Sequence, residues 1–314
     1  MKVLISDKTD PICGETLKSF PGIEVEERGG MSPEQLLQEI PSCEALVVRS
    51  ATKVTAQVIA AGTKLKAVGR AGAGVDNIDI QAASERGILV MNTPGGNANA
   101  VAELAVGMMF ALARKLLSTA EGMKADRWEK KGYQGGELAG KTLGLVGIGQ
   151  VGARVARKAA ALDMKVLAYD PFVKAEQVQE MGAELCELDR LYGQSDYISL
   201  HLPRNEQTAG MINGDAFERM KPGVFLINCA RGGIVEEADL LQALEQGRVA
   251  GAGIDVYEKE PPEDWSLAEH PAVIATPHIG AATGEAQVLV AQMIGRQIGQ
   301  YLSEGRVVHA VNQP

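Results

Sequence analysis

The chain has 314 residues and a mass of 33.2 kDa, which exceeds the usual size of a single hydrophobic core and predicts two domains. Its formal net charge of -9 disfavours binding to nucleic acid or to an anionic membrane surface, because both are themselves polyanions. The 46% of hydrophobic residues and the 36 glycines are typical of an α/β enzyme whose turns approach a ligand closely.

The sequence also indicates the compartment of the protein and argues against a membrane span and a metal site. The longest apolar run, residues 104–113, is about half as long as a membrane-spanning helix and predicts a buried helix instead. The opening residues MKVLISDK hold too short an apolar stretch for a signal peptide. The four cysteines lack metal-like spacing, which indicates free thiols in a reducing compartment. We therefore expect a cytoplasmic protein with no metal site and no membrane partner.

Short β-rich runs alternate with helical segments over residues 1–95. The runs begin at Val3, Ile23, Ala45, Leu65 and Ile88, so they recur every 20 to 23 residues. Ser32 and Pro33 form a helix start signal, since serine can cap a helix and proline suits its first turn. This rhythm predicts a small parallel α/β domain.

A second α/β series follows a turn rich in proline and glycine at residues 93–97. Residues 98–124 predict one long helix, and the polar segment 126–140 predicts a crossover between lobes. Six apolar runs then alternate with helical segments: TLGLVG, KVLAYD, YISLHL, VFLINC, AGAGIDV and VIATP. Their unbroken apolar character indicates strands that are covered on both faces. We expect a last helix, over residues 284–303, to return to the first lobe.

A glycine-rich turn predicts a dinucleotide site. Gly147, Gly149 and Gly152 have G-x-G-x-x-G spacing between a strand and a helix, and Asp170 ends the next strand 18 residues after Gly152. The glycines allow a pyrophosphate to approach the helix N-terminus, and the aspartate can bind a ribose diol. Because a carboxylate would repel a 2′-phosphate, NAD is favoured over NADP. The alternative for Asp170 is a turn-forming residue before Pro171.

Hydride transfer at an alcohol carbon needs a proton acceptor and a cation, which histidine and arginine can supply. His201 and His278 both lie at strand ends, where open parallel sheets bind ligands, so both are candidates. Arg231 follows another strand, and the two glycines after it leave room for a ligand. The alternatives are a structural histidine and an arginine that extends to solvent. An acid of the nearby loop could partner the imidazole, and the candidates are Asp255, Glu258 and Glu260.

Several segments resemble a known family. These segments are RSATKVTAQVI, VGRAGAGVDNID, VMNTPGGN, NCARGGIVEE, DVYEKEPP and PHIGAAT. The chain resembles the D-2-hydroxyacid dehydrogenases from end to end, and these segments together are similar to the 3-phosphoglycerate dehydrogenase branch of that family. The resemblance implies a Rossmann-type doubly wound parallel sheet, the NAD-binding lobe, inserted into a smaller flavodoxin-like α/β substrate lobe. The implied substrate-binding domain comprises residues 1–96 and 285–314, and the NAD-binding domain residues 97–284. It also implies a homodimer formed through the cofactor lobe.

The resemblance further implies an activity and the residues that carry it. The reaction is NAD-dependent oxidation of the C2 hydroxyl of 3-phospho-D-glycerate, the first step of the phosphorylated route to L-serine. His278 is similar to the family's acid/base, Glu260 to its partner and Arg231 to the substrate-orienting arginine. Asp255 corresponds to the acid that meets the nicotinamide carboxamide. Arg231 and His278 are also implied to contact the cofactor. The other implied cofactor contacts are Gly147, Gly149, Gln150, Val151, Gly152, Asp170, Leu202, Cys229, Ala230, Gly280 and Ala281, with Ala73 at a position where relatives often have threonine.

The implied phosphate contacts lie in the first lobe. Arg49 and Arg70 follow two of its strands, and Gly72 and Asn97 lie near the same turns. One alternative is another enzyme of the family, a glyoxylate or hydroxypyruvate reductase, which would not need two such arginines. The other is an NAD-sensing protein like the corepressors that share this fold, which turnover would exclude.

Overall fold

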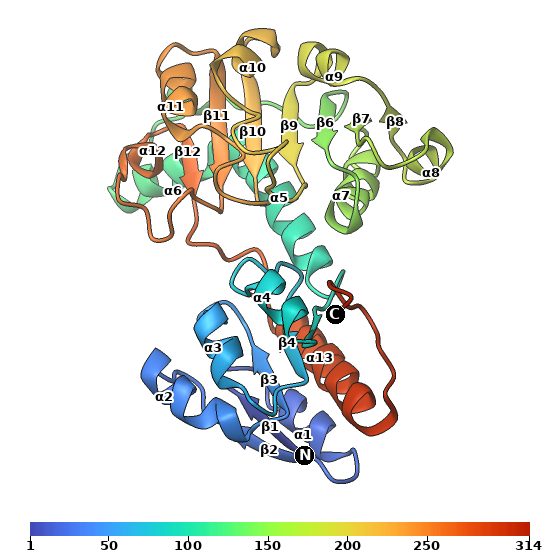
Figure 1. The fold of residues 1–314 in the computed structure, drawn as a ribbon. Coiled ribbons are helices and arrows are strands. Elements are labelled where there is room, and N and C mark those ends of the chain that lie inside the picture. Colours follow the sequence, from blue (N-terminus) through green and yellow to red (C-terminus); the bar gives the residue numbers. More distant parts are fainter. The chain divides into compact units, whose positions relative to one another are not determined.

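The computed structural model describes all 314 residues and divides into two compact units. Unit 1 comprises Met1–Asn97 and Ala281–Pro314, and unit 2 comprises Ala98–Gly280 (Figure 1). Each unit has its own parallel sheet with helices between successive strands. The predicted α/β fold class is confirmed. No helix of the chain has the length and apolar character needed to cross a bilayer.

The sheet of unit 1 has five strands in the order β2-β1-β3-β4-β5, and all its pairs are parallel. The strands are β1 Lys2–Ile5, β2 Glu24–Glu27, β3 Ala45–Val48, β4 Ala67–Arg70 and β5 Leu89–Met91. The helices are α1 Ile12–Lys18, α2 Pro33–Glu39, the 3₁₀ helix η1 Ile40–Ser42, α3 Ala56–Ala61, α4 Ile80–Glu85 and α13 Gly284–Glu304. This strand order is flavodoxin-like, as predicted. The carboxyl ends of β1, β3 and β4 therefore lie side by side.

The last helix of the chain, α13, belongs to unit 1 and packs closely on its sheet. A Cβ on Gly69 of β4 would overlap the side chain of Ile294 in α13. Ile294 and Ile298 are fully buried with residues of β1 and β3. The glycine in the strand therefore lets the helix approach the sheet.

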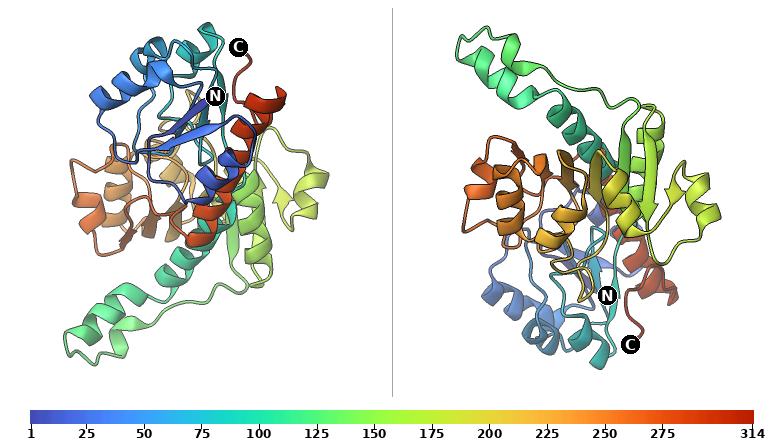
Figure 2. Two further views of the ribbon diagram at one scale, coloured as in Figure 1. Left: turned by 90° about the horizontal axis from the view of Figure 1, so that it is seen from below. Right: turned by 90° about the horizontal axis from the view of Figure 1, so that it is seen from above.

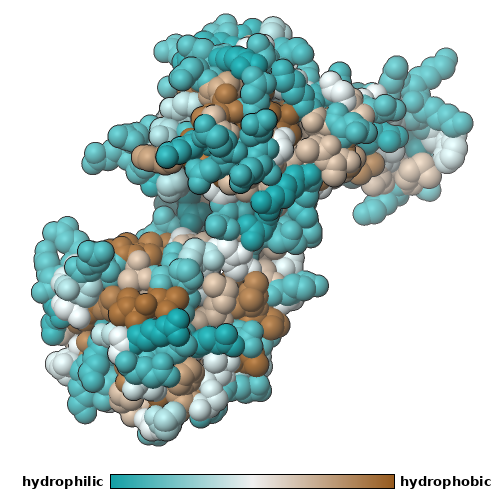
Figure 3. Space-filling model, turned by 90° about the vertical axis from the view of Figure 1, so that its right-hand side faces the viewer, coloured by the Kyte–Doolittle hydropathy of each residue, from teal (hydrophilic) through white to brown (hydrophobic).

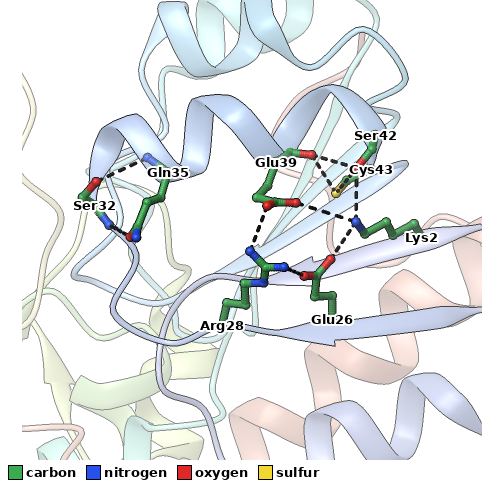
Figure 4. Close-up of polar contacts among 8 residues, drawn as sticks. All are labelled: Lys2, Glu26, Arg28, Ser32, Gln35, Glu39, Ser42 and Cys43. Carbon is green, nitrogen blue, oxygen red and sulfur yellow. Dashed lines mark hydrogen bonds and ion pairs between the residues drawn. The ribbon is translucent and has the colours of Figure 1, made fainter.

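A network of ion pairs ties β1, β2 and α2 together at the edge of this sheet (Figure 4). Lys2 Nζ lies 2.6 Å from Glu26 and 3.2 Å from the hydroxyl of Ser42. Arg28 contacts Glu26 and lies 2.8 Å from Glu39. The hydrogen bond from Lys2 lowers the pKa of the Glu26 carboxyl. Because Lys2 and Arg28 are partly exposed, this network orients elements more than it stabilises the fold.

The predicted helix start at Ser32 is confirmed. The Ser32 side chain accepts a hydrogen bond from the backbone of Gln35, whose side chain in turn accepts one from the Ser32 N–H (Figure 4). This reciprocal pair is a capping box, and Pro33 occupies the first turn of α2.

The sheet of unit 2 has seven parallel strands in the order β12-β11-β10-β9-β6-β7-β8. The strands are β6 Thr142–Val146, β7 Lys165–Tyr169, β8 Glu184–Leu185, β9 Tyr197–Leu200, β10 Val224–Asn228, β11 Val249–Ile254 and β12 Val273–Ala275. The helices are α5 Ala98–Ala113, α6 Leu116–Lys124, η2 Lys131–Tyr133, α7 Gln150–Ala160, α8 Ala175–Glu180, α9 Leu188–Gln194, α10 Gly214–Arg219, α11 Glu237–Glu245 and α12 Ser266–Glu269. Strand order reverses at β6, whose neighbours are β7 and β9, so the sheet is doubly wound as predicted.

Two hydrophobic clusters cover the two faces of this sheet. Neighbouring residues of β6 divide between them: Val146 belongs to one cluster, and Leu143 and Leu145 belong to the other. All three side chains are buried. A core on each face explains why the strands read as continuous apolar runs.

The prediction of one long helix over residues 98–124 is wrong at one point. The helix breaks between α5 and α6, where Lys115 adopts φ 49 in the left-handed region. Nor is the run 104–113 buried all round, since Phe110 is 39% exposed. In Figure 2, α6 stands away from the sheet of unit 2. A sequence with helical propensity throughout gives no sign of such a break.

Candidate active site

The glycine-rich turn lies at the carboxyl end of β6, where the strand order reverses. A Cβ on Gly147 would overlap the carbonyl of His201, and one on Gly152 would overlap the carbonyl of Gly147. Gly147 also has φ 90, which disfavours any other residue. In contrast, a Cβ on Gly149 would meet no atom within 4 Å. The first and third glycines thus allow close packing, while Gly149, at the N-terminus of α7, borders open space. A helix N-terminus of this kind is favourable for an anion, so the predicted pyrophosphate contact stays a prediction.

Asp170 links this turn to the segment after β7. One carboxylate oxygen accepts a hydrogen bond from the N–H of Ile148 at 3.0 Å, and the other accepts one from the N–H of Phe172 at 2.9 Å. The carboxylate therefore lies against the glycine-rich turn, where a ribose diol could also reach it. The alternative role in a turn holds as well, because the bond to Phe172 spans two residues.

The first turn of α7 presents Gln150 and Val151. Gln150 is exposed, and Arg154 donates from one guanidinium nitrogen to its carbonyl at 2.6 Å and to its side-chain oxygen at 3.0 Å. The amide nitrogen of Gln150 then remains available as a donor. Arg154 was not among the predicted site residues. The available signal was that Gln150 and Arg154 lie four residues apart on a predicted helix.

His201, one of the two histidines that spacing selected, lies under the turn rather than at an open site. Its Nε2 is 2.9 Å from the Ser199 hydroxyl, and its buried Nδ1 has no protein partner. Burial lowers the pKa of His201 to about 4. A ring that stays neutral near pH 7 fits a structural histidine. Leu202, predicted to contact cofactor, follows it and lies against Gly147, since a Cβ there would be 3.3 Å from its side chain.

Arg231 is presented by a short loop after β10. The side chain of Asn228, the last residue of β10, donates to the Arg231 carbonyl at 3.1 Å and accepts from the Ala230 N–H at 3.1 Å. Arg231 itself donates to the Ala230 carbonyl at 2.7 Å. Asn228 is only 2% exposed and was missed as a site residue. A lone amide ending the apolar run VFLIN was the available signal.

The loops after β10 and β11 touch. A Cβ on Gly232 would overlap the carbonyl of Tyr257, so only glycine fits beside Arg231 at this point. Tyr257 is buried, and its N–H donates to Glu260 Oε1 at 3.2 Å. A chain of contacts therefore runs from the arginine loop to Glu260.

Glu260 and His278 form the central pair of the candidate site. Glu260 Oε2 lies 2.7 Å from His278 Nδ1, and the side chains are 38% and 49% exposed. Glu260 follows β11 and His278 follows the adjacent strand β12. With one ring nitrogen on a carboxylate, the other is free to exchange a proton with a ligand. Asp255, Glu258 and Glu260 were the three candidate partners from sequence, and Glu260 is the one that contacts the imidazole.

Asp255 holds the loop that carries His278. Its carboxylate is 1% exposed and accepts from the Thr276 hydroxyl at 2.6 Å and from the N–H groups of Ile279 at 2.7 Å and Gly280 at 2.8 Å. These donors flank His278, which adopts φ 52. A left-handed histidine is strained, so the surrounding bonds must fix it. Asp255 is thus bonded to its own protein, and its predicted contact with the carboxamide stays a prediction.

Cys229 is buried beside Arg231, and its thiol lies 3.7 Å from the sulfur of Met108. Burial raises its pKa, so the thiol is not a nucleophile near neutral pH. The geometry therefore indicates a packing role for Cys229, and its predicted contact with the cofactor stays a prediction.

Unit 1 carries the predicted phosphate contacts. Arg49 follows β3, and Arg70 ends the neighbouring strand β4. The guanidinium of Arg70 lies over Gly72, where a Cβ would be 2.6 Å from one of its nitrogens. The two arginines therefore extend from adjacent strand ends of one sheet.

Three further predicted contacts also belong to unit 1. Ala73 accepts a hydrogen bond from Asn92 through its carbonyl at 2.5 Å, and Asn97 precedes α5. The carbonyl of Ala281 accepts from the Gln287 side chain at 2.7 Å. Their roles as ligand contacts stay predictions.

Comparisons with known proteins identify the family. The family model described as "D-isomer specific 2-hydroxyacid dehydrogenase, NAD binding domain" matches residues 106–280. D-3-phosphoglycerate dehydrogenase of Archaeoglobus fulgidus is 49% identical over 100% of this chain and 60% of its own length. The enzyme of that name from Homo sapiens is 45% identical over 99% of this chain and 58% of its own. The chain therefore spans about 60% of the length of these curated relatives.

Solved structures that match this chain support the same family. The NAD+-bound 3-phosphoglycerate dehydrogenase of Entamoeba histolytica matches with a TM-score of 0.85 and 31% identity, over 100% of this chain and 99% of that one. A glyoxylate reductase from Paecilomyes thermophila matches with a TM-score of 0.90 and 30% identity, over 99% and 98%. The predictions of NAD as cofactor and of the family are confirmed. The chain belongs to the D-isomer specific 2-hydroxyacid dehydrogenase family.

Proposed function

We propose that this chain oxidises 3-phospho-D-glycerate to 3-phosphooxypyruvate with NAD, the first step of the phosphorylated route to L-serine. The observation that carries the proposal is the Glu260–His278 pair, 2.7 Å apart. Glu260 and His278 follow the adjacent strands β11 and β12, and Arg231 follows β10, the other neighbour of β11. The names of the relatives at 45% and 49% identity support the choice of substrate.

In this proposal, NAD held by unit 2 would supply the acceptor for the hydride that leaves C2 of the substrate. His278 removes the proton of the C2 hydroxyl with its Nε2. Glu260, which contacts Nδ1, stabilises the imidazolium that results. Arg231 holds the substrate carboxylate and the C2 oxygen, because a guanidinium offers two parallel donors. The clamp by Asn228 keeps the arginine loop in place.

We assign the phosphate of the substrate to Arg49 and Arg70. Both residues stand at the carboxyl ends of neighbouring strands, so one edge of the sheet carries two permanent cations in a chain whose net charge is -9. Gly72 and Asn97 are proposed neighbours of the same group. A substrate without phosphate would lack the group that these arginines bind in this proposal.

We assign the cofactor to unit 2. Asp170 binds the ribose diol, and the N–H groups of Gln150 and Val151 at the start of α7 bind the pyrophosphate. Leu202, Ala230 and Gly280 are proposed contacts through their backbones, and Ala73 and Ala281 stay predicted contacts from unit 1.

A glyoxylate or hydroxypyruvate reductase is the second candidate, since a glyoxylate reductase is 30% identical to this chain. A panel of phosphorylated and plain 2-hydroxy acids, measured with NAD and with NADP, separates the two. We expect kcat/KM to be highest for 3-phospho-D-glycerate with NAD. Higher kcat/KM for glycolate or D-glycerate would favour the second candidate, and absent turnover despite bound NAD would favour an NAD-sensing protein.

We also propose a homodimer formed through unit 2. Large apolar side chains around α6 are exposed, and tan and scattered brown atoms lie among teal ones on the projecting segment at the upper right of Figure 3. They are Phe110, Leu116, Leu117, Met123 and Trp128, between 39% and 75% exposed. Sedimentation should show a dimer that Leu117→Asp weakens and the control Trp265→Asp does not. A wild-type monomer at micromolar concentration would contradict the proposal.

The four cysteines are all free thiols. This supports the proposed cytoplasmic location, where thiols stay reduced.

A further inference from the structure

The loop that carries Arg49 has no secondary structure of its own. It comprises Arg49–Thr52 and lies between the end of β3 and Val54, which forms an isolated bridge with Ile78. Ser50 and Ala51 at its tip are exposed. A four-residue loop with an exposed tip would be mobile unless its ends were held.

Asp7 holds the N–H groups of this loop. It follows β1, the neighbour of β3, and is 5% exposed. Its carboxylate accepts from the Arg49 N–H at 2.6 Å, from the Thr52 N–H at 3.2 Å and from the Thr52 hydroxyl at 2.6 Å. A buried carboxylate is costly unless its oxygens are satisfied, and here all three donors come from the one loop.

Asn77 holds the carbonyls of the same two residues. Its side-chain nitrogen donates to the Arg49 carbonyl at 2.8 Å and to the Thr52 carbonyl at 2.7 Å. The Asn77 carbonyl also accepts from the N–H of Val54 at 2.8 Å. Both backbone polar groups of Arg49 and both of Thr52 are therefore bonded to residues outside the loop.

The guanidinium of Arg49 is held as well. Arg49 donates from one guanidinium nitrogen to the carbonyl of Lys8, at 3.0 Å. Lys8 directly follows Asp7, so one segment fixes both the backbone and the charged end of Arg49. Ordering a rotamer-rich side chain before binding removes that entropy cost from the binding step.

We propose that Asp7 and Asn77 are positioning residues that hold Arg49 ready for the phosphate of the substrate. The inference rests on the proposed function, and it adds two residues that determine specificity by acting through Arg49. Their loss should weaken the preference for a phosphorylated acid, while hydride transfer itself depends on residues of unit 2.

The test compares Asn77→Ala with a matched control in the same unit. Asn312 makes three hydrogen bonds, with the Val90 N–H at 2.8 Å, the Ile88 carbonyl at 2.9 Å and the Ser84 hydroxyl at 3.0 Å. Asn312→Ala thus loses a similar number of bonds at the edge of the sheet. For each variant we would measure Tm, NADH affinity and kcat/KM for 3-phospho-D-glycerate and for D-glycerate.

We expect Asn77→Ala to lower the ratio of the two kcat/KM values about tenfold, mainly through KM for the phosphorylated acid. Asn312→Ala should lower Tm and leave the ratio unchanged. Asp7→Asn, which keeps one acceptor oxygen, should lower the ratio less than Asp7→Ala. In an Arg49→Ala background, Asn77→Ala should have no further effect on the ratio, because it acts through that arginine.

Two outcomes would overturn the inference, and they can be told apart. If wild type prefers the phosphorylated acid and Arg49→Ala removes that preference while Asn77→Ala keeps it, the inference alone is wrong. If wild type has no preference for the phosphorylated acid, the proposed function fails and the inference fails with it.

Discussion

Glu260 contacts His278 with one carboxylate oxygen, at 2.7 Å from Nδ1, and accepts a hydrogen bond from the Tyr257 N–H with the other. The carboxylate is therefore anchored on the loop after β11 while it orients an imidazole on the loop after β12. A proton taken up at Nε2 would leave a cation directly beside this carboxylate.

Glu260→Gln should keep this geometry and remove the charge. We expect kcat to fall about 100-fold with a small change in KM, because an amide cannot stabilise the imidazolium. Steady-state kinetics and a structure of the variant check this. Unchanged kcat with an intact His278 contact would show that the carboxylate only orients the ring.

Arg231→Lys should keep the positive charge and lose much of the activity. We expect kcat/KM to fall about 100-fold, since an ammonium cannot form two parallel hydrogen bonds with a carboxylate. NADH affinity serves as the control and should change little. A lysine variant with normal turnover would rule out the proposed two-point grip.

Asp255→Asn should disturb the loop that carries His278. The new amide NH2 would face a site that now accepts three hydrogen bonds, so at least one donor among Thr276, Ile279 and Gly280 loses its partner. Each unsatisfied buried group costs about 1–3 kcal/mol. We expect a lower Tm together with reduced kcat, measured by calorimetry and kinetics. A fall in NADH affinity alone would instead support a direct contact with the carboxamide.

His201 should make the folded state less stable in acid. Its pKa falls from 6.5 to about 4 on burial, so between these values the unfolded chain binds a proton that the folded chain does not. Stability from this group is complete above about pH 6.5 and is lost as the pH falls toward 4. From pH 7 to pH 5 the loss is about 2 kcal/mol. Urea unfolding at both pH values should show this difference, and a His201→Gln variant that keeps the full difference would contradict the assignment.

The sheets could be predicted from sequence because both are parallel and covered on two faces, which leaves continuous apolar runs such as VFLIN. The break at Lys115 could not, since its left-handed conformation has no marker residue. The short strand β8 was also missed, because two residues carry no pattern.

Candidate side chains were easier to predict than the groups that hold them. Arg231 and His278 stand out as polar residues at strand ends, and the resemblance chose His278 over His201. Asn228 and Asp7 were missed because each acts through hydrogen bonds to backbone atoms that only the fold brings near. The spacing of residues along a sequence does not reveal such hydrogen bonds.

We propose that a hydride leaves C2 of the phosphorylated substrate while His278 takes the hydroxyl proton. The most direct measurement mixes the protein and NAD with 3-phospho-D-glycerate deuterated at C2 and follows NADH by absorbance and mass. We predict NADH that carries the deuterium and forms more slowly than from unlabelled substrate. No NADH, or NADH without the label, would rule out hydride transfer from C2 of this substrate.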